Sequence, residues 1–130
     1  MKNNSDYDNP FLNTPYGIYQ PQCGIQNLTL SFGHDEYLYL VLKNNKFGDI
    51  HYLEEKYWNI IRFHSFYPWH TGGDYKEFMN STDDQLLKDV LHFNQFDLYS
   101  KEDTDFVLND HIKKYYHDLL NIYFPNPLNW

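Results

Sequence analysis

The sequence predicts an all-α fold of about four helices, and three observations support this prediction. Apolar residues recur at three- and four-residue spacing over four stretches of the chain, as they do on one face of a helix. Strand-like alternation of apolar and polar residues is almost absent. The chain has 130 residues, of which 42% are hydrophobic, so it is long enough to bury a core. We therefore expect one domain over residues 1–130, built by packing helix on helix.

The beginning of the chain is expected to be irregular. Pro10, Pro15 and Pro21 punctuate it, and proline favours turns and extended backbone over helix interiors. We therefore expect an irregular lead-in over residues 1–26 and a helical part over residues 27–130.

The first half of the helical part is expected to hold two helices. The first covers about residues 27–44, where four residues at helical spacing share one face: Leu30, His34, Leu38 and Val41. The second covers about residues 53–66 and has a face of the same kind: Tyr57, Ile60, Ile61 and His64. Pro68 and the following Gly72-Gly73 pair are expected to end this second helix.

Two more helices are expected in the second half. One begins near Thr82, which we predict as the N-cap of a capping box that Gln85 closes. Its apolar stripe ends in a carboxylate: Leu86, Val90, Phe93 and Asp97. The last helix covers about residues 105–123, and its apolar face is broad: Val107, Ile112, Tyr115, Leu119 and Ile122.

Composition excludes several classes of partner. Asp and Glu number 18 against 10 Lys and Arg, the formal net charge is −8, and Arg62 is the only arginine. Nucleic acid is therefore not an expected partner, because binding phosphates requires clustered basic residues. The longest run of hydrophobic residues has six, 37–42, whereas a membrane span needs about 20. The single Cys23 excludes an internal disulfide and favours a reducing, cytoplasmic compartment.

Three polar residues lie on predicted core-facing stripes: His34, His64 and Asp97. Two histidines and a carboxylate form a ligand set that suits non-haem iron and related metals, and helical bundles build such sites from facing helices. The alternative is that each histidine is buried and satisfied by a hydrogen bond. Asp97 would then pair with Arg62 or Lys101, because an unpaired buried carboxylate is unfavourable. The pattern alone leaves both interpretations open.

Three segments of the chain resemble the inositol oxygenase family. They read GHDEYLY at 33–39, RFHSFYPWHTGGDY at 62–75 and FNQFDLY at 93–99, in the order that the family has them. The resemblance implies an all-helical, HD-domain-like fold that holds a di-iron centre. It also implies an activity, the O2-dependent opening of myo-inositol to D-glucuronate.

The resemblance further implies roles for single residues. His34 and His64 match two of the family's four histidine ligands of iron. Asp97 matches the second of its two aspartate ligands, which bridges the irons. Ser65 matches a residue that contacts myo-inositol, and Lys101 matches a lysine on the substrate side.

The resemblance covers only about the C-terminal half of the family's length. The other ligands belong to the N-terminal part of the family, and this chain has no second His-Asp doublet that could replace them. We therefore expect part of an inositol oxygenase that needs an N-terminal half or a partner chain. The alternative is a catalytically inactive truncated remnant, or a helical interaction module, with at most one weak metal site. For the isolated chain, we expect inactivity.

Overall fold

The computed structural model describes residues 3–47, 50–97 and 107–130. It contains the helices α1 (His34–Asn44), α2 (Glu55–Phe63), α3 (Tyr67–His70), α4 (Asp83–Asp97) and α5 (Asp110–Tyr123), with the 3₁₀ turns η1 (Ile25–Asn27) and η2 (Lys76–Phe78). The only strands in the described ranges, β1 (Lys46–Phe47) and β2 (Ile50–His51), form a two-residue antiparallel pair. The predicted all-α class is therefore confirmed. Along the described ranges, none of the helices combines the length and apolar character needed to cross a bilayer.

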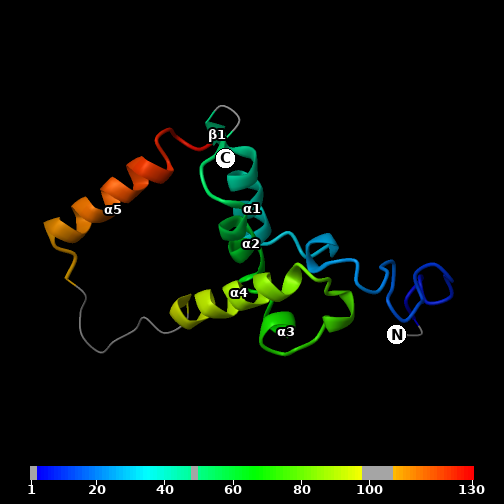
Figure 1. Cartoon of the computed structure of the whole chain (residues 1–130). Coiled ribbons are helices and arrows are strands. Elements are labelled where there is room, and N and C mark those ends of the chain that lie inside the picture. The colour runs from blue at the N-terminus through cyan, green and yellow to red at the C-terminus, as the bar shows by residue number, and fades with distance from the viewer. Residues whose placement is uncertain (1–2, 48–49, 98–106) are drawn as a thin grey trace.

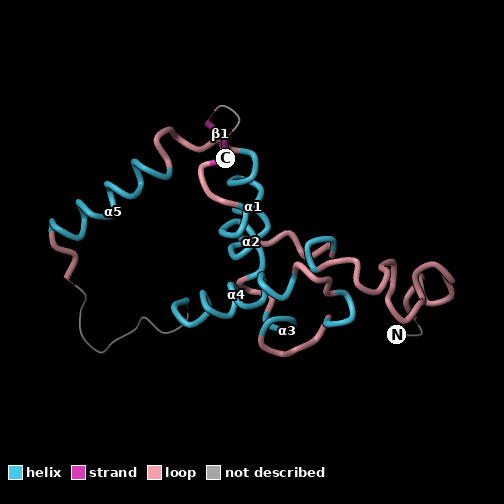
Figure 2. Tube along the Cα trace, viewed as in Figure 1, coloured by secondary structure: helices cyan, strands magenta, loops and turns pink. Residues whose placement is uncertain are grey.

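The helices meet around α2. α1 packs along α2, and α4 packs against both α2 and α3 (Figure 1). The segments that lead into α1 and that connect α3 to α4 are mostly loop and contain the short turns η1 and η2, respectively (Figure 2). α5 stands away from the other helices, whereas the C-terminus returns to the end of α1 that carries β1 (Figure 1).

The expected starts and ends of the first two helices need correction. α1 begins at His34, not near residue 27, and the preceding residues form a single 3₁₀ turn and an irregular segment. Leu30 nevertheless packs against the core, so its helical spacing to His34 reflects burial and not helix. α2 ends at Phe63, and the short α3 follows after a break at residues 64–66.

The predicted capping box at the start of α4 is wrong. The Thr82 hydroxyl donates to Asn80 Oδ1 over 2.7 Å, and the Gln85 amide donates to Asp89 Oδ1 over 2.9 Å. The residue that fastens this end of the helix is Asp83, whose side chain is 1% exposed.

Asp83 joins the start of α4 to the lead-in of α1. Its Oδ2 accepts hydrogen bonds from the backbone amides of Ile25, over 3.0 Å, and of Asn80, over 2.8 Å. A buried carboxylate that accepts two amides fixes both segments, because the buried Ile25 amide has no water as an alternative partner and the Asn80 amide is partly buried.

Two apolar clusters form the core. The larger lies where α2, α3 and α4 meet the lead-in: Ile25, Leu28, Phe63, Trp69, Phe78, Leu86 and Val90. The smaller joins α1 and α2 through Tyr39, Leu42 and Trp58, and Phe124 and Leu128 pack against it.

The last residues of the chain are fastened to α1. The side chain of Asn45, at the end of α1, donates to the carbonyl of Asn129 over 3.0 Å and accepts from its amide over 2.8 Å. The ring of Trp130 stacks on Tyr37 with centroids 6.4 Å apart. The C-terminus therefore contacts the helix that begins with His34.

α5 has the predicted amphipathic pattern but buries none of its residues. Tyr115 and Ile122, two members of the predicted face, are exposed, and so is Val107 before the helix. The expected start near residue 105 lies outside the described residues. The apolar face of α5 is therefore correctly placed on a helix, yet nothing in the described part of the chain covers it.

Replacing Asp83 is expected to destabilise the fold strongly. Asp83→Ala leaves the buried Ile25 amide and the partly buried Asn80 amide without this partner and should lower the free energy of unfolding by about 2–4 kcal/mol. Urea denaturation of the whole chain measures this change. Asp84→Ala is the control, because Asp84 occupies the same helical turn but is exposed. Equal effects of the two substitutions would contradict the role given to Asp83.

Candidate functional site

Two histidines that lie 30 residues apart in the sequence face each other across the α1–α2 contact. His34 is the first residue of α1, and His64 is the C-cap that follows the last residue of α2. Their Nε2 atoms are 3.2 Å apart, and their rings are nearly perpendicular, at 80°. The structure therefore brings together two of the three metal ligands that the sequence predicts.

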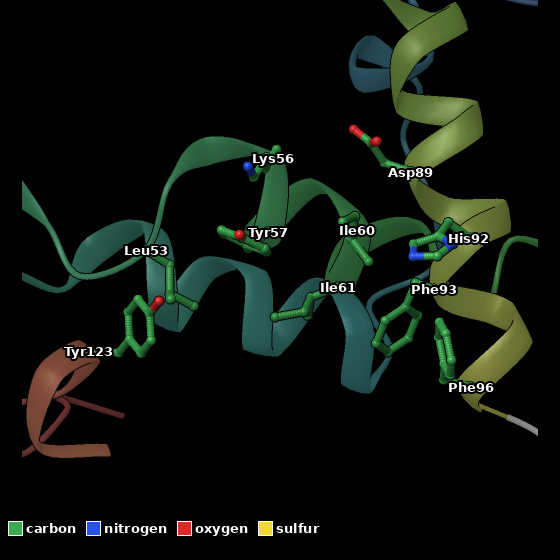
Figure 3. A pocket seen from close by; sticks show the side chains of 10 residues that line it. All are labelled: Leu53, Lys56, Tyr57, Ile60, Ile61, Asp89, His92, Phe93, Phe96 and Tyr123. Carbon is green, nitrogen blue, oxygen red and sulfur yellow. The ribbon is translucent and has the colours of Figure 1, made fainter. Parts of the chain in front are cut away.

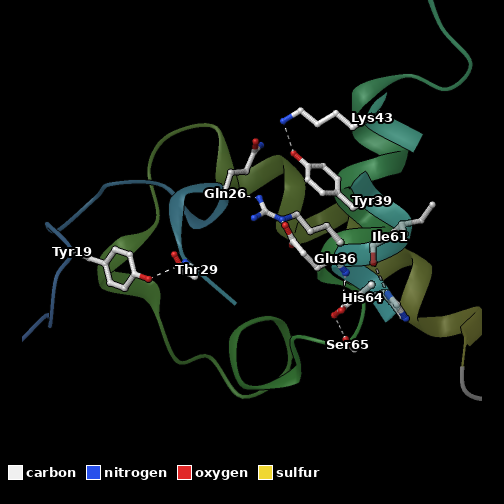
Figure 4. Close-up of polar contacts among 11 residues, drawn as sticks. Tyr19, Gln26, Thr29, Glu36, Tyr39, Lys43, Ile61, His64 and Ser65 are labelled. Atoms are coloured by element: carbon white, nitrogen blue, oxygen red, sulfur yellow. Dashed lines mark hydrogen bonds and ion pairs between the residues drawn. The ribbon is translucent and has the colours of Figure 1, made fainter. Parts of the chain in front are cut away.

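The tautomer of His64 follows from its other ring nitrogen. Its Nδ1 lies 2.6 Å from the carbonyl oxygen of Ile61, one turn back on α2 (Figure 4). A carbonyl oxygen only accepts, so Nδ1 carries the proton and donates it. In the neutral ring, Nε2 then holds a lone pair that points at His34. A metal-binding histidine is commonly oriented by a carbonyl in this way.

The separation of the two Nε2 atoms fits a shared metal ion. Metal–nitrogen bonds of about 2.0–2.1 Å place two such atoms about 2.9 Å apart at a right angle and about 3.4 Å apart at a tetrahedral angle. The observed 3.2 Å lies between these values. A direct hydrogen bond from His34 to His64 fits the same distance in the absence of metal. The donor set is thus suited to a first-row metal such as iron.

Asp97 does not join His34 and His64. Among the described residues, no group of three or more His, Cys, Asp and Glu side chains could hold a metal ion. Asp97 is the last residue of α4 and is exposed, so the expectation of a buried carboxylate is wrong. The apolar face of α4 is buried only as far as Val90, and Phe93 is already partly exposed. The Phe93 ring contacts the His64 ring edge-on. The ligand role of Asp97 stays a prediction, and Lys101 lies outside the described residues.

Arg62 does not pair with Asp97, as one interpretation of the sequence suggested. Its Nε donates to Glu36 Oε2 over 2.7 Å, and its Nη1 donates to the carbonyl of Gln26 over 2.9 Å. The guanidinium lies 4.7 Å from the centroid of the Tyr39 ring. Because the side chains of Arg62 and Glu36 are only 12% and 17% exposed, this ion pair fixes α1 against α2.

Asp35 and Ser65, the neighbours of the two histidines, are also paired. The Ser65 hydroxyl donates to Asp35 Oδ2 over 2.5 Å (Figure 4), and the Glu36 amide donates to Oδ1 over 2.8 Å. Burial alone raises the pKa of Asp35, but these hydrogen bonds and the nearby His34 outweigh burial and lower it. Asp35 is therefore a carboxylate at neutral pH. Since the Ser65 proton is committed to it, the Ser65 oxygen offers its lone pairs to any further partner.

A hollow of about 480 Å³ lies beside this paired cluster. His34, Asp35 and Ser65 line one part of it, and Ser31 and Tyr75 line another. Tyr75 has a left-handed backbone, with φ 63° and ψ 13°, which is uncommon for a bulky residue. Hydroxyl groups and one carboxylate next to His34 form a suitable surface for a polyol.

A second hollow, of about 590 Å³, is apolar and lies between α2 and α4. Figure 3 shows Phe93 and Phe96 of α4 beside Ile60 of α2, with Tyr123 of α5 at the far end. Phe96 is 64% exposed. An exposed aromatic groove of this kind is typical of a surface that another segment covers.

His70 has polar contacts that the sequence did not indicate. Its Nε2–H donates to the His64 carbonyl over 3.0 Å, and its Nδ1 accepts from the Thr71 hydroxyl over 2.9 Å. Burial lowers the pKa of His70, although the hydrogen bond to His64 acts in the opposite direction. In the sequence, His70 stood only at the edge of a glycine-containing turn. Its position six residues after His64, among aromatic residues, was the available signal.

The glycine pair in that turn serves close packing. A Cβ on Gly72 would lie 2.7 Å from the carbonyl oxygen of Pro68, and Gly73 has φ +78°. The turn therefore requires glycine for its own geometry.

Comparison with known proteins gives a consistent result. A family model described as myo-inositol oxygenase matches residues 1–130. Curated proteins named inositol oxygenase are similar over the whole chain: that of Sus scrofa is 46% identical, that of Danio rerio 46% and that of Dictyostelium discoideum 45%. The 130 residues cover 44%, 45% and 43% of these proteins, respectively. The chain thus spans less than half the length of the curated relatives.

Arg62→Lys is expected to destabilise the chain although it keeps the charge. Lysine cannot reach Glu36 and the Gln26 carbonyl together, so the free energy of unfolding should fall by about 1–3 kcal/mol in urea denaturation. Lys56→Met is the control, because the Lys56–Glu54 ion pair is exposed and should contribute little to stability. An Arg62→Lys variant as stable as this control would show that Arg62 does not fix α1 against α2.

Proposed function

The chain belongs to the myo-inositol oxygenase family, and from this premise we propose that it forms part of the metal site of an inositol oxygenase. His34 and His64 would be ligands of one iron, and Asp97 would be a further ligand. The observation that supports this proposal best is the approach of the two Nε2 atoms to 3.2 Å, with the Nδ1 proton of His64 committed to Ile61. Iron, when bound, would supply the O2 chemistry that opens myo-inositol to D-glucuronate.

The residues beside the histidines would bind the substrate. The Asp35 carboxylate and the Ser65 oxygen present acceptors to the polar hollow, and the hydroxyl groups of myo-inositol are donors. Lys101 is proposed as a further substrate contact on the resemblance alone. A cytoplasmic location is part of this proposal, because Cys23 is a free thiol and reducing compartments preserve thiols.

The whole activity would need a second segment. We assign it to the part of the family that this chain does not span, an N-terminal half or a partner chain that brings the remaining iron ligands. Two apolar surfaces support this assignment: the groove between α2 and α4, and the uncovered face of α5. The isolated chain is then inactive.

The same two surfaces favour one other function. A catalytically inactive remnant that has kept its fold would act as a helical interaction module through the α2–α4 groove. The two candidates differ in whether association restores oxygenase activity, so one set of experiments separates them.

Removing either histidine is expected to weaken metal binding. Titration of the metal-free chain with Co²⁺, followed by its visible absorption, should show one weak site. His34→Ala or His64→Ala should each lower the affinity at least about tenfold, since each removes one of the two histidine ligands. His111→Ala alters an exposed histidine on α5 and should have no effect. Co²⁺ binding that is insensitive to both site substitutions would contradict the metal site.

Association with the missing segment is expected to create activity. The chain co-expressed with the unmatched part of the Danio rerio relative should copurify with it, bind two irons and form glucuronate from myo-inositol. Phe96→Asp introduces a charge into the apolar groove and should reduce copurification, whereas Phe11→Asp, at a lead-in residue that is 81% exposed and lies outside both apolar surfaces, should not.

Each outcome of this experiment separates the candidates. Turnover by the 130-residue chain alone would disprove its incompleteness. Copurification without iron or turnover would favour the interaction module.

A further inference from the structure

The segment between α2 and α3 must hold His64 in place although helical hydrogen bonding has ended there. His64 is the C-cap of α2, and carbonyl groups at the end of a helix lack an intrahelical partner. The His64 carbonyl finds its partner in His70, whose Nε2–H donates to it over 3.0 Å. His70 is 5% exposed, so water does not compete effectively for this bond.

The orientation of His70 is itself fixed. Its Nδ1 accepts from the Thr71 hydroxyl over 2.9 Å, so both ring nitrogens are occupied and one tautomer is selected. Its ring packs against Tyr67, with centroids 5.0 Å apart, and its amide donates to the Phe66 carbonyl over 3.2 Å. His70 is therefore a rigid donor to the His64 backbone and has no nitrogen free to bind a metal.

His64 is held at two points. Its ring is anchored by Nδ1–H to the Ile61 carbonyl, and its backbone carbonyl is anchored by His70. If the backbone peptide unit at His64 rotated, the imidazole ring would move away from Ile61, and its Nε2 would turn away from His34. The hydrogen bond to Ile61 sets the tautomer of His64. The hydrogen bond from His70 to the His64 carbonyl keeps the ring within reach of Ile61.

We propose that His70 is a positioning residue, which directs His64 Nε2 toward His34 by binding the His64 backbone carbonyl in the buried turn between α2 and α3. This inference rests on the proposed function, because it treats His64 as a metal ligand. Polar groups behind a metal ligand typically change the metal affinity by about 10- to 100-fold when they are replaced.

The test follows the ring nitrogens of His64 in the ¹⁵N-labelled, metal-free chain by NMR. The wild-type His64 is expected to show a protonated Nδ1 and an unprotonated Nε2. His70→Phe keeps the bulk of the side chain but removes the donor. In this variant, we expect His64 ring ¹⁵N chemical shifts that are averaged between the two tautomers, and a Co²⁺ affinity that is approximately tenfold lower. His70→Gln offers an amide donor to the His64 carbonyl and should restore the wild-type spectrum. His111→Phe is the matched control at an exposed histidine.

The outcomes separate the positioning role from the metal site. A folded His70→Phe variant with an unchanged His64 tautomer and unchanged Co²⁺ affinity would overturn the proposal. Should His70→Phe fail to fold by circular dichroism, Thr71→Val tests it instead by removing the donor to His70 Nδ1. Averaged His64 shifts in Thr71→Val would then support the proposal, and unchanged shifts would overturn it. If the wild-type chain binds no Co²⁺ but the His64 tautomer depends on His70, positioning stands and the proposed metal site fails.

Discussion

The register between the first turn of α1 and the end of α2 is the constraint on which the candidate site depends. Three polar pairs lie side by side there: Glu36 with Arg62, Asp35 with Ser65, and His34 with His64. Polar pairs of this kind have narrow limits of distance and angle, whereas apolar contacts tolerate sliding. The partly buried ion pair and the serine–aspartate hydrogen bond therefore set the position in which the two imidazoles meet.

The sequence predicted the fold class because apolar spacing at three and four residues is a local property. It placed the start of the first helix too early, because Leu30 has helical spacing to His34 and Leu38 but packs against the core from irregular backbone. It predicted a local cap at Thr82, whereas Asp83 binds an amide 58 residues away, and no local pattern reports such a partner. Asp97 looked buried because its neighbours are apolar, but the described chain provides no surface that covers them.

The candidate site was predictable to the extent that it lies in compact motifs. His34 and His64 stood in segments with a clear family resemblance, and the structure brings them together. The roles of Arg62, Asp35 and His70 were not predictable, because each depends on a partner that the tertiary fold supplies. Arg62, for example, contacts Glu36, which lies 26 residues earlier and on another helix. The sequence motifs identify the candidate side chains, whereas helix packing determines which of these side chains are in contact.

The fastening of the chain end to α1 has a practical consequence for engineering this protein. Asn129 is bonded to the last turn of α1 through Asn45, and Trp130 stacks on Tyr37 within the same helix. A fusion or affinity tag at the C-terminus would pull on the helix whose first residue is His34. The first described residues, from residue 3 on, lie far from this contact (Figure 1), so a tag on that side of the chain leaves the register of α1 undisturbed.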